Sequence, residues 1–461
     1  MSLERRHHVD DDDDGDEIEK RKAKKVRKTP ADFLLLDRLG HQNQSDDDGD
    51  STWTAPSVTS RGVRFQLSLR PEEPPAVSRL LFKAVIPSDI LTSYSNLSNA
   101  AADAYFLIRP SSTQFDLVVV SSDDKAVLLQ ASCGGGRDYF VMDHHLDSHH
   151  SPPALSARLQ EMPPCTRISI RLGLMRRAAA DDSYVVAGLE TGDKGWWHVS
   201  FLSTSANVWR RKPVRLAAPE LRDWHHLDWD EVDLVACGGR FYWLDLRRGL
   251  LSCSCDSLLA AEDDDDEPLG LQFTLLPNVT MKQAREARIC NYPLTRDQCV
   301  GVSGGHLRYV EVSAHRHRPS SSYSPVAPPA LCDDCRGGSV TSWVLVDGRS
   351  AGAWAKEHTL KFADVWREDS YRSTGLPMEA PEFPLVHPLD PNILYFSIRE
   401  GKDVSGREFC VHLGTKQVKS CSSSYKGLNV DVALEPVFAA SLKTTRAVAA
   451  STTDGGFVPR L

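Results

Sequence analysis

The segment from residue 232 to residue 255 contains three short apolar runs separated by two glycine-containing turns. Gly238-Gly239 separates the first two runs, and Arg248-Gly249 separates the second from the third. Glycine adopts at little cost the positive φ that tight hairpin turns demand. We therefore predict three antiparallel strands here, with Val232 to Cys237 pairing with Arg240 to Leu246.

The same order of strand, Gly or Asp turn and aromatic-rich strand recurs along the chain, with turns near residues 123, 193, 239, 305 and 391. A second clear hairpin is predicted for Cys299 to Val302 with His306 to Val312. The spacings between these turns, 70, 46, 66 and 86 residues, are too irregular for a strict repeat, but each could hold a four-stranded sheet with inserted loops.

This grouping predicts an all-β, β-propeller-like fold of about six irregular blades. A single blade cannot cover both of its faces, so aromatic side chains should fill the space between blades; the candidates are Trp196, Trp197, Phe241, Trp243 and Phe396. A β-sandwich is the competing architecture. Its strands would recur every 8 to 12 residues without the coarser grouping.

Composition and charge limit the environment of the chain. It has 461 residues, of which 41% are hydrophobic and 25% charged, and a net charge of −9. The longest apolar runs fall far short of the ~18 residues of a membrane span, and the N-terminus lacks the apolar stretch of a secretory signal. We expect an intracellular protein, in the nucleus or the cytoplasm, whose eleven cysteines are mostly buried free thiols.

Charge runs suggest three regions. Residues 1–30 are predicted to form a disordered tail, acidic and then basic, because they contain too few apolar residues to bury a core. Residues 31–445 should form the propeller-like domain, and residues 446–461 a flexible C-terminal tail. Polar loops are expected within the domain at Asp143 to Pro153, Glu262 to Pro268 and Ser313 to Pro329.

The basic half of the N-terminal tail has one concrete functional interpretation. Seven of the nine residues from 20 to 28 are cationic: Lys20, Arg21, Lys22, Lys24, Lys25, Arg27 and Lys28. Such a cluster fits a nuclear localisation signal read by importin. The alternative is a solvated tail whose cations balance the acidic residues upstream, among them Asp10 to Asp14. Nucleic-acid binding is disfavoured because the chain is acidic overall and has no second basic stripe.

Four segments carry a resemblance to a known family: residues 33–37, 75–78, 240–253 and 364–369. The most specific are the Trp-Leu-Asp-Leu-x-x-Gly-Leu-Leu pattern from Trp243 to Leu251 and the sequence Trp366-Arg367-Glu368-Asp369. Together they resemble the plant "domain of unknown function 1618" family, which is large in grasses, over residues 33 to 445. That family has no established activity. Its likeness to the propeller-type domains that follow F-box motifs implies a protein-binding module, although residues 31–60 lack the helices of an F-box.

The sequence Gly301-Val-Ser303-Gly-Gly305 matches G-x-S-x-G, the nucleophile elbow of serine hydrolases. An elbow needs a strand, a strained turn and then a helix. Residues 306–312 alternate like a strand instead, which predicts a hairpin turn at Ser303 to Gly305. We therefore disfavour a hydrolase.

Candidate metal ligands are incomplete. Cys332 and Cys335 have zinc-knuckle spacing, but a structural zinc site needs a second such pair, and Cys253 and Cys255 fit strand packing equally well. Four histidines in the 143–153 loop, His144, His145, His149 and His150, have no fixed geometry. Markers of phosphate binding, zinc proteolysis and dinucleotide binding do not occur. No catalytic, cofactor-binding or metal-binding residue is predicted.

These observations favour a non-catalytic protein-interaction module, in which rigid blades support variable loops that contact an unknown protein partner. The rival hypothesis is an enzyme whose pocket lies at the propeller's central channel. The two can be distinguished, because an enzyme should bring carboxylates, histidines or metal ligands from several blades into the channel.

Overall fold

The structure of the protein is a computed structural model. It describes residues 33–43, 53–88, 115–123, 126–133, 136–143, 154–159, 171–177, 183–191, 197–216, 229–260, 268–287, 294–313, 337–346, 354–399, 405–422, 425–426 and 438–443. The chain divides into a unit of residues 1–31 and a unit of residues 32–461, and every described residue lies in the second. Within these ranges, no helix has the length and apolarity needed to cross a membrane.

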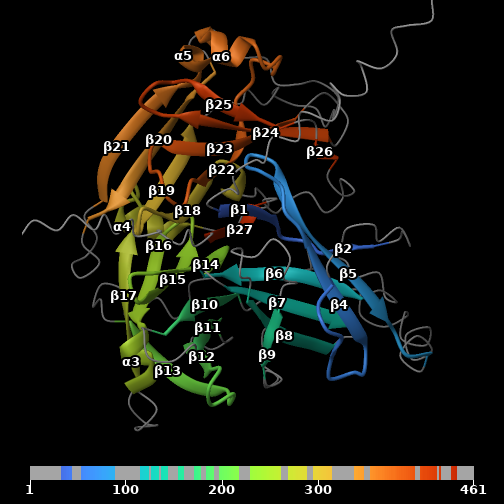
Figure 1. Ribbon diagram of the computed structural model, residues 1–461. Coiled ribbons are helices and arrows are strands. Elements are labelled where there is room, and N and C mark those ends of the chain that lie inside the picture. Colours follow the sequence, from blue (N-terminus) through green and yellow to red (C-terminus); the bar gives the residue numbers. More distant parts are fainter. Residues whose placement is uncertain are drawn as a thin grey trace, which may run out of the picture. The chain divides into compact units, whose positions relative to one another are not determined.

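Most of the described residues are in β-strands, which form five sheets (Figure 1). The eight-stranded sheet consists of two antiparallel four-stranded halves, joined where its strands at residues 214–216 and 269–271 run parallel. Counting the halves separately gives six units that follow one another along the chain, and we call them blades 1 to 6. The predicted all-β, propeller-like fold with about six irregular blades is confirmed.

Blade 1 contains β1 (Phe33–Asp37), β2 (His41–Gln42), β3 (Ser57–Val58), β4 (Arg64–Arg70), β5 (Val77–Val85) and β27 (Phe438–Lys443). Blade 2 contains β6 (Asp116–Ser122), β7 (Ala126–Cys133), β8 (Gly136–Asp143) and β9 (Ala154–Arg158). Blade 3 contains β10 (Leu172–Arg176), β11 (Tyr184–Thr191), β12 (Trp197–Ser203) and β13 (Arg210–Leu216).

Blade 4 contains β14 (Asp233–Cys237), β15 (Arg240–Asp245), β16 (Gly249–Ser254) and β17 (Leu269–Leu275), with helix α3 (Cys255–Ala260) before β17 and α4 (Met281–Glu286) after it. Blade 5 contains the 3₁₀ turn η3 (Leu294–Arg296), β18 (Gln298–Ser303), β19 (His306–Ser313), β20 (Ser339–Leu345) and β21 (Trp354–Lys361). Helices α5 (Phe362–Arg367) and α6 (Asp369–Arg372) lead to blade 6, which contains β22 (Glu382–Val386), β23 (Ile393–Arg399), β24 (Ser405–His412), β25 (Val418–Cys421) and β26 (Tyr425–Lys426).

Both predicted hairpins are present. β14 pairs antiparallel with β15, and β18 pairs antiparallel with β19. The glycines of the two turns adopt the positive φ that the sequence predicts: 58° and 73° at Gly238 and Gly239, and 55° and 78° at Gly304 and Gly305. Local turn chemistry therefore accounts for these elements.

The turns identified from the sequence do not all occupy the same place in a blade. Those near residues 123, 239, 305 and 391 join the first strand of a blade to the second, whereas the one near residue 193 joins β11 to β12, the second strand to the third. In blade 3 the corresponding first turn lies between β10 and β11. Part of the irregular spacing predicted from the sequence arose from this difference.

The blades pack side by side through six apolar clusters, one in each seam. In the seam between blades 3 and 4, Trp197 and Phe201 pack against Trp243 and Phe273. Phe396 lies in the seam between blades 5 and 6. The prediction that aromatic side chains fill the seams is thus confirmed for Trp197, Phe241, Trp243 and Phe396, and Trp196 lies outside the described residues.

β27 of blade 1 and the first strands of blades 2 to 6 lie next to one another in order. β27 contacts β6, and contacts then continue from β6 to β10, β14, β18 and β22. A cluster containing Phe33 and Leu35 of blade 1 with Tyr395 and Cys410 of blade 6 joins the last blade to the first. β27, from the C-terminal part of the chain, pairs with β1, so the two ends of the domain complete one sheet.

Candidate functional site

A cavity of about 770 Å³ lies among the first strands of five blades. Its wall is formed by residues of β6, β10, β14, β18 and β22 and of the turns that follow them. We call this cavity the central channel. Its volume falls within the range of pockets that bind small molecules.

The turns after the first strands form one rim of the channel. The Gly304 amide donates a hydrogen bond of 2.9 Å to the Pro388 carbonyl, which joins the turns of blades 5 and 6. The Cys237 thiol lies 3.5 Å from the Gly305 carbonyl, which brings the turn of blade 4 beside them. Leu389, the residue after Pro388, is 43% exposed. We call these turns, residues 238–239, 304–305 and 388–389, the glycine rim.

Arginine–carboxylate pairs occur where the first strands begin. Arg38 Nη2 of blade 1 lies 3.4 Å from Oδ2 of Asp233, the first residue of β14 in blade 4. Arg296 of η3 pairs with Glu382, the first residue of β22. Both pairs join different blades, so they brace the channel rather than serve one strand.

A third carboxyl group, Glu231, precedes β14. Burial raises its pKa well above the ordinary 4.5, and the negative charge of Asp233 adds to this, while the Arg171 guanidinium from the start of blade 3 opposes it. Burial therefore favours the protonated form of the Glu231 side chain. A protonated carboxyl group can donate a hydrogen bond, but it is a poor general base.

The channel also contains hydrogen-bonding groups without charge. Gln298, at the start of β18, lines it, and the buried Gln298 Oε1 has no hydrogen-bond partner in the structure. The neighbouring Thr295 belongs to η3 and lines the same cavity. On the neighbouring strand, β22, Phe383 has φ 52° within an irregular stretch. This backbone conformation is strained for a residue other than glycine, and such strain is often found at functional sites.

Three cysteines line the channel: Cys237, Cys255 and Cys299. Burial raises the pKa of Cys299 to about 12 and that of Cys255 to about 11. Both thiols are therefore protonated at neutral pH, and protonated thiols are poor nucleophiles and metal ligands. Over the described ranges, no group of three or more His, Cys, Asp or Glu side chains could hold a metal ion.

The residues of the G-x-S-x-G match have structural roles. Ser303 ends β18, is fully buried, and is followed by a turn and the strand β19, so the nucleophile-elbow interpretation is wrong and the predicted hairpin is confirmed. A Cβ atom at Gly301 would lie only 2.6 Å from Val386 Cγ2. Glycine at this position lets β18 and β22 approach closely, while Gly305 supplies the turn.

Cys253 and Cys255 do not share a strand as the sequence suggested. Cys253 lies in β16, but α3 begins at Cys255. Both side chains are buried in the seam between blades 3 and 4, and burial raises the pKa of Cys253 to about 12. They pack as apolar side chains.

Several candidates from the sequence lie outside the described residues. These are the cationic cluster at residues 20–28, the four histidines of the 143–153 loop, and Cys332 and Cys335. Most of the 262–268 loop and nearly all of the 313–329 loop also lie outside. The functional interpretations of these segments remain predictions.

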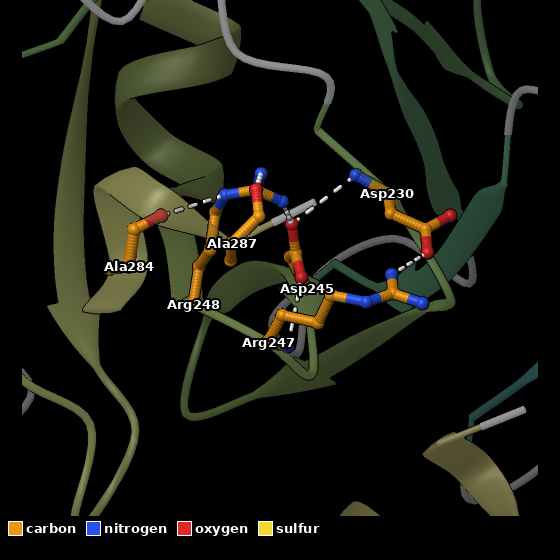
Figure 2. Close-up of polar contacts among 6 residues, drawn as sticks. All are labelled: Asp230, Asp245, Arg247, Arg248, Ala284 and Ala287. Atoms are coloured by element: carbon orange, nitrogen blue, oxygen red, sulfur yellow. Dashed lines mark hydrogen bonds and ion pairs between the residues drawn. The ribbon is translucent and has the colours of Figure 1, made fainter. Parts of the chain in front are cut away.

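A buried polar network lies in blade 4, within the Trp243 to Leu251 pattern. Asp245 is fully buried, and its Oδ2 accepts a hydrogen bond of 2.5 Å from Arg248 Nη1. Figure 2 shows the Arg248 guanidinium between this carboxylate and the carbonyl groups of Ala284 and Ala287, to which it donates bonds of 3.0 and 2.5 Å. These carbonyls lie at the C-terminal end of α4, where backbone acceptors lack partners within the helix.

Asp245 also organises the turn around it. Its Oδ1 accepts a hydrogen bond of 2.9 Å from the Arg247 backbone amide, and its Oδ2 accepts one of 3.2 Å from the Asp230 backbone amide. The Arg247 side chain forms an ion pair with the Asp230 carboxylate (Figure 2). The pattern thus carries a structural bracket that ties α4 to the β15–β16 turn. The signal for this bracket in the sequence is an aspartate followed by two arginines between apolar runs.

Comparison with solved structures gives only weak likenesses. A polysaccharide lyase, the PL25 ulvan lyase, has a TM-score of 0.34 at 9% identity, over 86% of this chain and 85% of the other. An apocarotenoid oxygenase mutant from Synechocystis has a TM-score of 0.36 at 10% identity, over 86% and 78% of the two chains. A hypothetical selenium-binding protein from Sulfolobus tokodaii has a TM-score of 0.28 at 11% identity, over 87% and 76%. These scores are too low to support an inference about fold or activity.

No curated protein matches the chain. A family does match, over residues 243–395, a range that contains both the Asp245–Arg248 bracket and the Trp366 to Asp369 sequence. Its description is "Protein of unknown function (DUF1618)", which confirms over residues 243–395 the family resemblance predicted from the sequence.

Proposed function

We propose that the protein is a non-catalytic protein-interaction module. The main support is the pairing of the carboxylates at the strand-start end of the channel. Asp233 and Glu382 each face an arginine from another blade, and Glu231 is favoured in its protonated form beside Arg171. Groups held in this way brace the blades, and a rigid frame suits a protein that presents surface loops to a partner.

The glycine rim offers a contact surface for that partner. Leu389 is the exposed large apolar residue of this rim, and the adjacent Gly304 and Gly305 have no side chains that would keep a partner away from the backbone. A large apolar side chain loses its contact with water when a partner covers it, and this burial stabilises the complex. We expect Leu389 to be such an anchor.

Proximity labelling with the full-length chain fused to a biotin ligase tests this proposal. Leu389→Asp should remove a specific set of labelled proteins without lowering the melting temperature, because the side chain is exposed. Met378→Asp, at another exposed apolar residue, between α6 and β22, is the matched control and should leave the set intact. Identical labelling by wild type and both variants, or turnover of a small molecule by the purified chain, would contradict the proposal.

We expect the cationic cluster at residues 20–28 to act as a nuclear localisation signal for this module. A transport receptor such as importin reads clustered lysines and arginines in an extended peptide. Changing Lys24, Lys25, Arg27 and Lys28 to alanine should move a fluorescent fusion out of the nucleus without changing the melting temperature of the protein. If the unmutated fusion is already excluded from the nucleus, or if the change has no effect, the cluster is only a solvated tail.

A further inference from the structure

We propose that the central channel is a binding site for a neutral, hydroxyl-rich small molecule about the size of a disaccharide. This site is independent of the protein-interaction role proposed above, because it lies inside the channel rather than on its rim. Four features support it: an open entrance, balanced charge, unused hydrogen-bonding capacity and an apolar face.

The glycine rim provides the entrance. A Cβ atom added at Gly238, Gly239 or Gly305 would meet no atom within 4 Å, so these positions border open space. At the other end, Asp233 is held by Arg38, whose side chain is 7% exposed. The cavity of about 770 Å³ is therefore reached past the glycine rim and bounded by an ion pair at its far end.

Charged residues of both signs line the channel, which disfavours a ligand with a large net charge. Asp233 Oδ2 forms an ion pair with Arg38, and Asp233 Oδ1 accepts a hydrogen bond of 2.9 Å from the Leu234 backbone amide. Asp123 Oδ2 accepts a hydrogen bond of 2.8 Å from the Arg176 backbone amide. Arg177 and Asp256, which have opposite charges, both line the rim side. An ion entering the channel would lose hydration and meet like as well as opposite charges, so a single complementary charge would not offset the cost of desolvation.

Neutral hydrogen-bonding groups have capacity to spare. Gln298 Oε1 is buried without a partner, and a buried acceptor that lacks a donor destabilises a protein. A ligand hydroxyl could supply that donor, and the Thr295 hydroxyl on η3 can both donate and accept. Two such groups on neighbouring elements suit a molecule with several hydroxyl groups.

The neighbouring strand β22 supplies an apolar surface. Phe383 and Pro384 of β22 line the channel together with Val386. The left-handed backbone of Phe383 is held in place by the irregular pairing of β22 with β23. Saccharide rings present C–H groups on one face and hydroxyls at the edge, so they can contact an aromatic ring and a glutamine at the same time.

Saturation-transfer NMR on the purified full-length chain tests the site, with cellobiose, maltose and sucrose as probes and with citrate and spermidine as charged probes. We expect saturable transfer to at least one disaccharide and none to the charged probes. Gln298→Ala should weaken that binding about tenfold, since it removes one hydrogen bond to a buried acceptor. Gln417→Ala, an exposed glutamine in the turn between β24 and β25, is the matched control and should leave the affinity unchanged.

Two further variants keep the test decisive if Gln298→Ala does not fold. Thr295→Val keeps the shape of the side chain but removes its hydroxyl, and Phe383→Gly removes the ring while suiting the left-handed backbone. Each should weaken disaccharide binding in a chain that still melts cooperatively. The proposal is overturned if no disaccharide shows saturable transfer at millimolar concentration, if citrate or spermidine binds instead, or if binding survives the folded channel variants unchanged.

Discussion

At the scale of single residues, Glu408 of β24 is a carboxyl group placed in the interior. It is 2% exposed, and its Oε2 accepts a hydrogen bond of 2.7 Å from the Ser422 hydroxyl. Burial raises its pKa from 4.5 to about 7; the Ser422 bond opposes this shift, and the negative charge of Asp37 in β1 adds to it. The protonated form is therefore favoured in the folded state.

This shift makes stability depend on pH. Between about pH 4.5 and 7 the folded state holds a proton that the unfolded state has released, so the stabilisation present at low pH is lost as the pH rises through this window. Glu408→Gln keeps a neutral partner for Ser422 and removes the buried charge. We expect it to raise the free energy of unfolding at pH 8 by up to about 3 kcal/mol and to change it little at pH 4.5.

Thermal unfolding at both pH values measures this effect. Glu72→Gln, at an exposed position, serves as the control and should leave the melting temperature unchanged at either pH. A melting temperature for Glu408→Gln that equals or falls below that of the wild type at pH 8 would show that the Glu408 charge is accommodated in the folded protein.

At the scale of elements, the hairpins are predictable from the sequence, while the short helices are not. A tight turn with positive-φ glycines depends only on a few adjacent residues. Gly238-Gly239 and Gly304-Gly305 therefore identify the hairpins β14–β15 and β18–β19 directly. Helix α4 has a capping box formed by Thr280 and Gln283 at its start, but it is six residues long. Such a short helix depends on tertiary contacts, and here Arg248 supplies one.

The Arg248 bracket leads to a prediction about α4. Arg248→Met should lower the free energy of unfolding by about 3–5 kcal/mol, because it leaves the buried Asp245 carboxylate without its counter-charge and the end of α4 without donors. The double variant Asp245→Asn/Arg248→Met should be less destabilised than the single one, since asparagine carries no charge. Urea denaturation of both variants measures the difference, and equal losses would mean that the ion pair does not account for the effect.

At the scale of the whole domain, closure depends on residues from both ends of the chain. β1 is fully buried and pairs with β27 on one side and β5 on the other, so blade 1 is incomplete without residues 438–443. A buried strand edge with unpaired backbone groups is strongly unfavourable.

Truncation tests this closure. Deleting residues 438–461 should lower stability by several kcal/mol, at about 1 kcal/mol for each lost ladder hydrogen bond. Deleting residues 446–461 alone, or residues 1–30, should leave the melting temperature nearly unchanged, because these segments were predicted from the sequence to bury little apolar surface. If the longer C-terminal deletion melts like the wild type, β27 does not close the domain.

The candidate site was less predictable than the fold. Gln298, Phe383 and Arg38 are ordinary residues in the sequence, and their positions around one cavity follow from the order of the blades. The glycine rim was partly visible, since its turns were identified from the sequence, but its two glycine turns and Pro388 come together only in the folded chain.

The sequence by itself determined the all-β class, the two clearest hairpins and the aromatic filling of the seams, because alternation, glycine turns and ring-sized apolar side chains act over a few residues. The tertiary structure alone decided which residues meet across the channel. Arg38 and Asp233 are 195 positions apart, and β1 and β27 come from opposite ends of the domain. Such contacts depend on the number of blades and on how the last joins the first, and no local pattern encodes either.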